Sequence, residues 1–149
     1  MQTKTVAKRT WHFSHNIGMA VGSGKGFSHP SSVAIAPDGV LYVLSRGQEG
    51  SGGVVAENKR IGKLTIDEEF IRDFGRGELT WPNSLAVAAD GNVYISDEFD
   101  NYVAVYNPDG ERLTKFGEVG SGDGQLGGPA GLAFDSDDNL YVVDAGNNR

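Results

Sequence analysis

Residues 81–117 read WPNSLAVAADGNVYISDEFDNYVAVYNPDGERLTKFG, and this stretch decides the fold. It holds a series of short apolar or β-rich runs, at residues 84–88, 93–96, 102–106 and 111–116. Turn residues such as Asp90-Gly91 and Asp109-Gly110 separate the runs, so the pattern predicts an antiparallel meander. The first two runs are apolar almost throughout, which indicates a sheet covered on both faces. Such a sheet must pack against others of its kind.

The same pattern occurs before and after this stretch. Each copy has a proline before an apolar run, an aspartate eight positions later and a tyrosine twelve positions later; the sets are Pro30-Asp38-Tyr42, Pro82-Asp90-Tyr94 and Pro129-Asp137-Tyr141. The prolines are spaced by 52 and 47 residues, close to the ~40–50 residues of a four-stranded propeller blade. The sequence therefore predicts an all-β protein, a β-propeller built of four-stranded antiparallel blades, with about three blades' worth of chain.

Three segments carry a resemblance to a known family. They are HPSSVAIAPDGVLYVLSRG (29–47), WPNSLAVAADGNVYISDEFDN (81–101) and GPAGLAFDSDDNLYVVDAGNNR (128–149). They resemble the NHL-repeat pattern P-x-G-[IV]-A-x-D-x-x-G-x-[IVL]-Y-V-x-D-x-x-N-x-R, with departures at Ser45 (Asp97 and Asp144 in the other copies) and at Tyr102 (Arg60 and Arg149 in the others). The resemblance implies the N-terminal part of a six-bladed propeller. It does not fix the function, because the family includes scaffolds, RNA binders and a few lyases or hydrolases.

The repeats predict that residues 1–149 form a single propeller segment made of several blades. Residues 1–18, with strand patterns at 3–6 and 10–17, are expected to supply one or two outer strands of a neighbouring blade; blades follow at 30–75 and 82–117, and half a blade at 129–149. The sequence stops where the third strand of that last blade is expected. The expected partners are therefore the missing blades of a longer chain or, alternatively, a second copy that completes a six-bladed ring.

Composition excludes several classes of function. The chain has no cysteine, which excludes thiol catalysis and cysteine-bound zinc. Its formal net charge of −7 argues against a nucleic-acid partner, because phosphate binding needs a clustered basic surface. No apolar run approaches the ~18 residues of a membrane span, and no secretory leader is recognisable, so we expect no membrane partner and a cytoplasmic location.

The candidate binding site comes from propeller topology. Linkers before each first strand, and loops between second and third strands, share one face around the mouth of the central channel. The first repeat carries an insertion, 46–59, on that face, and insertions confined to one face often mark a binding side. We expect a binding or scaffold module there for a small ligand, peptide or protein, without a cofactor; the residues are His29, Arg46, Glu49, Arg60, Arg76 and Trp81. A glycine-rich loop without a ligand remains the alternative.

A second hypothesis is enzymatic. Resembled propeller enzymes of the lyase and lactonase or hydrolase type hold a divalent metal at the channel mouth, and the positions here that could serve are His29, Asp97 and Asp144. The same aspartates, at the ends of second strands, are expected to bind backbone N–H groups or a neighbouring arginine. Whether the chain is an enzyme stays open at this point.

Overall fold

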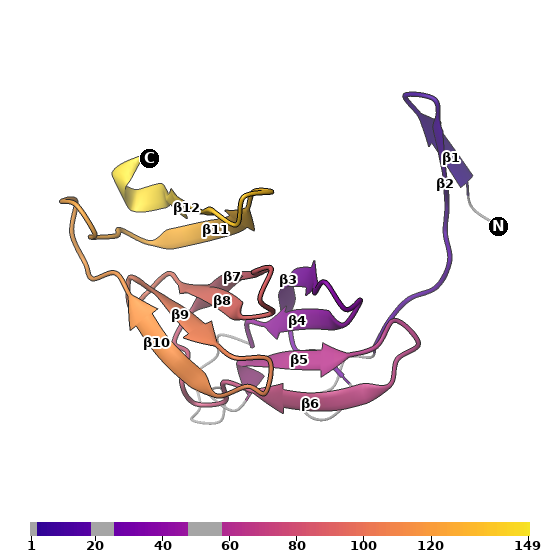
Figure 1. Ribbon diagram of the computed structural model, residues 1–149, viewed down its shortest axis with the longest axis horizontal. Coiled ribbons are helices and arrows are strands. Elements are labelled where there is room, and N and C mark those ends of the chain that lie inside the picture. Colours follow the sequence, from indigo (N-terminus) through magenta and orange to yellow (C-terminus); the bar gives the residue numbers. More distant parts are fainter. Residues whose placement is uncertain (1–2, 19–25, 48–57) are drawn as a thin grey trace.

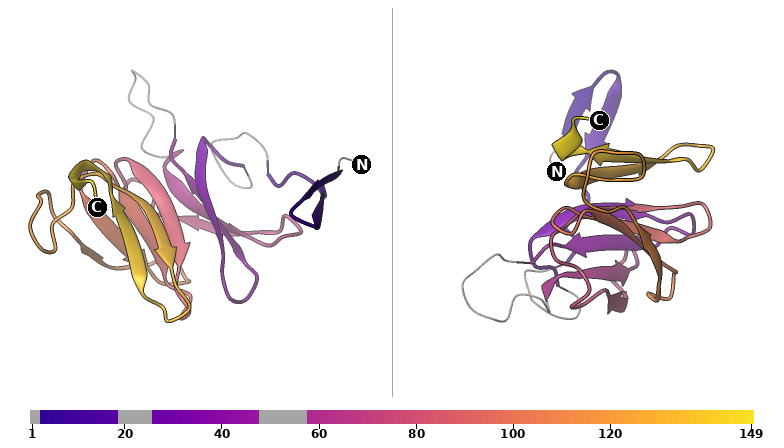
Figure 2. Two further views of the ribbon diagram at one scale, coloured as in Figure 1. Left: turned by 90° about the horizontal axis from the view of Figure 1, so that it is seen from above. Right: turned by 90° about the vertical axis from the view of Figure 1, so that its left-hand side faces the viewer.

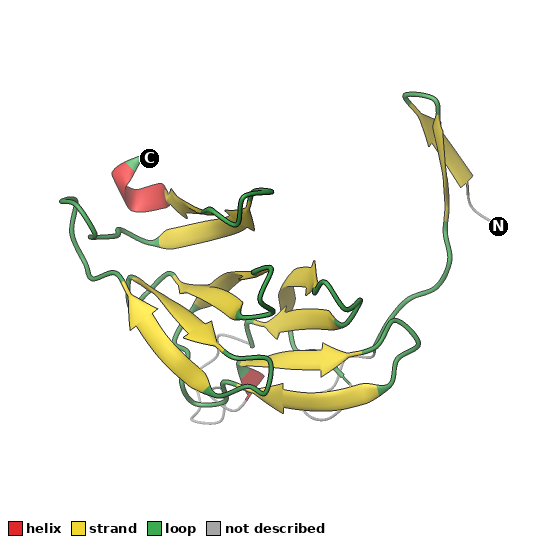
Figure 3. Cartoon of the chain, in the orientation of Figure 1, coloured by secondary structure: helices red, strands yellow, loops and turns green. Residues whose placement is uncertain are grey.

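The computed structural model describes residues 3–18, 26–47 and 58–149, and this part of the chain is built almost entirely of strands and turns (Figures 1 and 3). The first sheet consists of β3 (Pro30–Ile35), β4 (Leu41–Ser45), β5 (Arg60–Leu64) and β6 (Phe70–Phe74). The second consists of β7 (Pro82–Val87), β8 (Val93–Asp97), β9 (Tyr102–Tyr106) and β10 (Arg112–Phe116). The third consists of β11 (Pro129–Phe134) and β12 (Leu140–Asp144), followed by the 3-10 turn η2 (Ala145–Asn147). The predicted all-β repeat architecture is confirmed.

Local sequence explains why each sheet is a meander. All pairings between the named strands are antiparallel and join neighbours in the chain, and tight turns have glycine where the backbone becomes left-handed, as at Gly91 (φ 86°) and Gly110 (φ 83°). A polar side chain fixes these turns further: Asp90 Oδ1 accepts a hydrogen bond from Asn92 N at 2.9 Å, and Asn107 Oδ1 accepts one from Asp109 N at 3.0 Å. In the third sheet Asp138 takes the glycine position, with φ 64°, which Asp tolerates better than most residues.

The sheets stack through their first strands, so that β7 lies between β3 and β11 (Figure 2). A repeated hydrogen bond joins them. Ser32 Oγ accepts from Leu85 N at 3.1 Å, and the equivalent Ser84 Oγ accepts from Leu132 N at 3.2 Å. Consecutive sheets are therefore related as consecutive blades of a partial propeller, with the first strands innermost.

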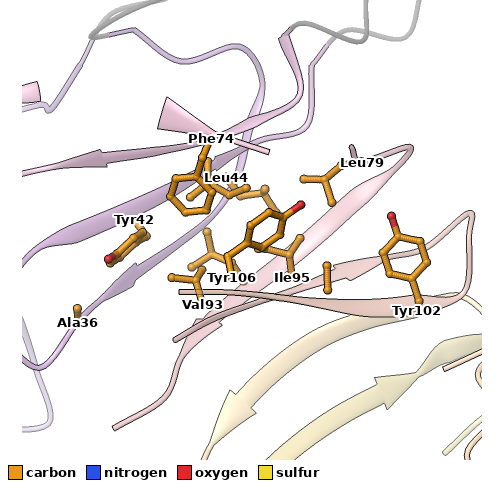
Figure 4. Close-up of a cluster of buried hydrophobic side chains, with 12 residues drawn as sticks. Ala36, Tyr42, Leu44, Phe74, Leu79, Val93, Ile95, Tyr102 and Tyr106 are labelled. Carbon is orange, nitrogen blue, oxygen red and sulfur yellow. The ribbon is translucent and has the colours of Figure 1, made fainter. Parts of the chain in front are cut away.

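The core lies between the first and second sheets (Figure 4). Tyr42 and Phe74 come from the first sheet and Ile95 and Tyr106 from the second, and all four are buried. The rings of Phe74 and Tyr106 meet across the interface, with centroids 5.3 Å apart. Burial of each such side chain stabilises the fold by roughly 1.5–3 kcal/mol, so the interface between sheets is also the core of the protein.

Both ends of the stack expose apolar side chains. Tyr42 is 2% exposed between sheets, whereas its counterpart Tyr141, on the outer side of the third sheet, is 62% exposed. On the opposite end, Val33 and Ile35 of β3 are exposed. These faces carry the same residue types as the faces that pack between sheets.

The N-terminal residues differ from the sequence expectation. β1 (Thr3–Val6) and β2 (Arg9–His12) pair with each other as a hairpin, and the second strand ends at His12 rather than continuing to residue 17. Ile17 instead packs, with Phe27, against the buried cluster of Leu41, Val43 and Leu64 on the first sheet. Ile17 thus lies against an apolar face of the first sheet and not in a strand. No helix among the described residues is long and apolar enough to cross a membrane.

Candidate functional site

Equivalent residues of the first two sheets meet where their second strands end. Arg46 directly follows β4, and Glu98 directly follows β8. Each is held by its backbone to the residue before the first strand of its own sheet: Arg46 N donates to His29 O, and Glu98 N donates to Trp81 O, both at 3.0 Å. These contacts bring the entering linker and the loop after the second strand together along one edge of the stacked sheets, as the propeller topology predicts.

Side chains from the first and second sheets contact each other along this edge. The guanidinium carbon of Arg46 lies 5.9 Å from the centroid of the Trp81 ring, within range of a cation–π interaction. Arg46 Nη2 also forms an ion pair with Glu98 Oε2 at 3.6 Å. The side chains of Arg46 and Glu98 are 30% and 37% exposed, so the pair lies at the surface but is partly shielded.

Two further side chains extend the group. Asn83 Nδ2 donates to Glu98 Oε2 at 2.8 Å, and the Phe99 ring lies 5.3 Å from the Trp81 ring at an interplanar angle of 55°. Phe99 is 59% exposed. Together these residues form the mouth cluster: Arg46, Trp81, Asn83, Glu98 and Phe99.

Asp97, beneath the cluster, fixes its shape. The carboxylate is fully buried. Its Oδ2 accepts from Thr80 N at 2.6 Å, and its Oδ1 accepts from Trp81 N at 3.1 Å and Asp100 N at 3.2 Å. One carboxylate therefore ties the linker that carries Trp81 to the loop that carries Glu98 and Phe99. Asp97 is a positioning residue for the mouth cluster.

The predicted binding residues separate into two groups. Arg46 and Trp81 belong to the mouth cluster, and the exposed His29 (φ 50°) lies beside them through its backbone carbonyl. Arg60 and Arg76 instead share a carboxylate on the outer side of the first sheet: Arg60 Nε lies 3.4 Å and Arg76 Nη2 2.5 Å from Asp73 Oδ2. Glu49 lies outside the described residues.

Arg60 has a structural environment. Its side chain is 1% exposed, and its Nη2 donates to Gly26 O at 2.6 Å, which anchors the linker that enters the first sheet. Burial lowers the pKa of Arg60 below its ordinary value, the nearby Arg76 lowers it further, and Asp73 counteracts them. The buried guanidinium of Arg60 therefore anchors the linker through Gly26 O and is not exposed for ligand binding.

The aspartates of the metal hypothesis are engaged by the protein itself. Asp144 Oδ1 accepts from Gly127 N at 2.6 Å, while its Oδ2 accepts from Asn147 Nδ2 at 2.8 Å and from Arg149 Nε at 2.9 Å. The backbone hydrogen bond from Gly127, and then those from Asn147 and Arg149, hold the pKa of Asp144 below its usual value. Over residues 3–18, 26–47 and 58–149, no three His, Asp or Glu side chains are grouped as metal ligands.

Sequence reasoning missed Asn83, Glu98 and Phe99. A signal was available for two of them. Glu98 is the repeat counterpart of Arg46, and the opposite charges at these equivalent positions of neighbouring blades were a signal that could have indicated a contact. Phe99 is a single large apolar residue in the polar loop DEFDN (97–101).

Parts of the chain resemble known proteins. The family model described as NHL repeat matches residues 126–149, which contain β11, β12 and Asp144. The chain contains an NHL repeat. Among curated proteins, a stretch of this NHL-repeat chain is 40% identical over 65 residues to the RING finger protein nhl-1 of Caenorhabditis elegans, covering 40% of the chain and 7% of the worm protein.

Solved structures with the same fold include enzymes. Virginiamycin B lyase from Staphylococcus aureus matches with a TM-score of 0.58 at 20% identity, over 80% of the NHL-repeat chain and 36% of the lyase. A gluconolactonase from Xanthomonas campestris matches with a TM-score of 0.55 at 20% identity, over 80% and 36%. At this identity the likeness shows the fold alone. The chain spans well under half the length of these proteins.

Proposed function

We propose that this NHL-repeat chain is a binding module whose mouth cluster receives an extended segment of a partner protein. A propeller fold with an NHL repeat supports a binding or scaffold role, and the mouth cluster supports this face as the site. The observation that carries the proposal is the contact of the exposed Phe99 ring with the half-buried Trp81 ring, beside an ion pair. Tryptophan and arginine are enriched among the residues that dominate binding energy at protein interfaces.

The exposed Phe99 ring favours a peptide over a small molecule. Two cavities, of about 330 Å³ and 210 Å³, lie elsewhere: one beside β12 and the linker to β11, the other among the turns at Asp38 and Asp90. Neither is lined by a residue of the mouth cluster. Small-molecule sites are usually concave, whereas protein partners bind shallow surfaces with projecting aromatic anchors.

Peptide selection tests the proposal. Random peptides displayed on phage would be selected on the immobilised chain and then measured singly against Phe99→Ala, which removes the exposed ring. We expect selected peptides to lose about tenfold or more in affinity, as a central aromatic anchor does. Leu113→Ala, at an exposed position of β10, is the matched control and should leave affinity unchanged. Equal binding to wild type and Phe99→Ala would contradict the proposal.

The lyase or lactonase hypothesis stays a prediction with weaker support. It draws on the fold that the chain shares with these enzymes. It requires the carboxylates of Asp97 and Asp144 to exchange their backbone donors for a metal ion, which would release the linkers that they anchor. Calorimetric titration with Mn²⁺, for wild type and His29→Ala, tests it: a stoichiometric site that His29→Ala weakens would favour the enzyme.

The expected partners at the two ends of the stack also stay a prediction. The exposed Val33, Ile35, Tyr141 and Val143 match the residue types buried between sheets, which supports coverage by further blades. Light scattering after size exclusion gives the mass in solution. A dimer whose unfolding midpoint rises with concentration would support a second copy, whereas a monomer at all concentrations would favour blades in the same longer chain.

A further inference from the structure

We infer that the mouth cluster recognises an arginine side chain of the partner, and that Arg46 occupies the arginine place in this structure. This inference rests on the proposed function, since it names the ligand chemistry of the same site. The place is formed by Trp81, Asn83, Glu98 and Phe99, all from the second sheet or its loops. Arg46 reaches it from the first sheet, so the site is complete without the residue that fills it.

The contacts of Arg46 define what the site accepts. A guanidinium can lie over an indole and pair with a carboxylate at the same time, because it is planar, delocalised and weakly hydrated. Arg46 does both, with Cζ 5.9 Å from the Trp81 centroid and Nη2 3.6 Å from Glu98 Oε2. A lysine ammonium is a compact, strongly hydrated charge that presents no flat face to the indole. The site therefore favours arginine over lysine.

Glu98 is prepared to bind a second donor. Asn83 holds Oε2 at 2.8 Å, which orients the carboxylate before any ligand arrives. Within the described part of the chain, no hydrogen bond reaches the other oxygen, Oε1. An incoming guanidinium can then bind both oxygens in the fork geometry that makes arginine–carboxylate pairs strong.

Phe99 and the charge of the chain favour a basic peptide. The exposed Phe99 ring extends the aromatic surface beyond Trp81, where it can cover the methylene groups of an arginine or an apolar neighbour in the peptide. The net charge of −7 attracts a cationic segment and raises its rate of association. Both features act on the same kind of partner.

Arg46 competes with the partner under this arrangement. Its guanidinium must leave Trp81 and Glu98 before an external arginine binds, and the apparent affinity falls by the fraction of time that Arg46 occupies the place. Removal of Arg46 should therefore strengthen arginine binding, whereas removal of an ordinary contact residue would weaken it. The opposite signs separate a competitor from a contact.

Two tryptophans make the experiment direct. The ¹⁵N-labelled chain has only the indole N–H signals of Trp11 and Trp81, and Trp81 belongs to the site. The probe is acetyl-Gly-Arg-Gly-amide, with acetyl-Gly-Lys-Gly-amide as its control. We expect the arginine peptide to shift the Trp81 signal, to bind Arg46→Ala about threefold or more tightly than wild type, and to bind more tightly than the lysine peptide.

A second variant guards against misreading. Glu98→Gln, made in the Arg46→Ala chain, keeps the size of the side chain and removes its charge; we expect about a tenfold loss in affinity for the arginine peptide. Arginine binding that is no tighter in Arg46→Ala than in wild type would overturn the inference. Equal affinities for the two peptides, or an unchanged affinity in Glu98→Gln, would overturn it as well.

The outcomes also separate this inference from the proposed function. Selected peptides that depend on Phe99 but contain no enriched arginine would leave the binding module standing and remove the arginine site. Peptides that ignore Phe99, together with an unshifted Trp81 signal, would remove both.

Discussion

The first and second sheets have the same strand order, but they hold their entering linkers with different side chains. In the second sheet Asp97, the last residue of β8, accepts backbone hydrogen bonds from both Thr80 and Trp81. In the first sheet Ser45 takes that position, and its hydroxyl accepts one bond, from Ser28 N at 3.3 Å. The first residue of the third strand compensates.

The third-strand position shows the same exchange. Tyr102 Oη donates to Glu78 O at 3.1 Å, whereas Arg60 Nη2 donates to Gly26 O at 2.6 Å. In the third sheet the equivalent Arg149 donates to linker carbonyls that include Gln125 O at 3.0 Å. Every sheet thus ties its linker down with a buried acceptor and a long donor. The geometry recurs while the residue type changes, which identifies these positions as scaffold and distinguishes them from the next residue, Arg46 or Glu98, which belongs to the mouth cluster.

Replacement of Asp97 should have the largest effect. Asp97→Ala leaves three backbone N–H groups without their acceptor, and each buried unsatisfied donor costs about 1–3 kcal/mol. We expect the free energy of unfolding, measured in urea at neutral pH, to fall by about 3 kcal/mol. Asp100→Ala, which removes an exposed acceptor of the Thr80 hydroxyl, is the control and should cost under about 1 kcal/mol. A loss of similar size in both would refute the special role of Asp97.

High pH should weaken the second sheet selectively. Burial, and next the charge of Asp97, raise the pKa of Tyr102 to about 12. The folded state therefore favours the protonated phenol of Tyr102. The contribution of this phenol to the free energy of unfolding is complete below the unfolded pKa of about 10 and is lost as pH rises toward about 12. We expect a loss on the order of 2 kcal/mol over this range in urea titrations. Tyr102→Phe should make the decline shallower; an identical slope would contradict the assignment.

Replacement of Ser45 should cost less than that of Asp97. Ser45→Ala removes a single hydrogen bond, from Ser28 N, while Arg60 still anchors the linker. A decrease of about 1 kcal/mol in the free energy of unfolding is expected. If Ser45→Ala were as damaging as Asp97→Ala, the two sheets would share one anchoring mechanism and the comparison would fail.

The smallest effect on stability belongs to Phe99. Because the ring is largely exposed, Phe99→Ala should change the free energy of unfolding by no more than about 0.5 kcal/mol. Thermal unfolding followed by circular dichroism measures this. A large loss would place Phe99 with the scaffold residues instead of the recognition surface.

The sequence by itself determined the repeats, the strands and the turns of the three sheets. These features depend on patterns within about fifty residues, namely apolar runs, Asp-Gly turns and prolines in constant register, and such patterns act through local backbone preference. They also assigned Arg46, Arg60, Arg76 and Trp81 to one face, without indicating that Arg46 contacts Trp81 while Arg60 and Arg76 pair with Asp73. These local patterns did not predict that β2 ends at His12 and that Ile17 packs on the first sheet, because that packing depends on residues distant in the sequence.

Only the tertiary structure decided which charged residues are buried in the scaffold and which lie in the mouth cluster. Arg46 and Arg60 look alike in sequence, yet Arg60 is buried against Gly26 and Asp73, while Arg46 crosses to Trp81 and Glu98. No local sequence pattern predicts the burial of Arg60 or the cross-sheet contacts of Arg46, since each depends on where a neighbouring strand or sheet places its carboxylate or ring. Burial and cross-sheet contact are properties of the stack, and they separate the scaffold arginine from the one at the recognition surface.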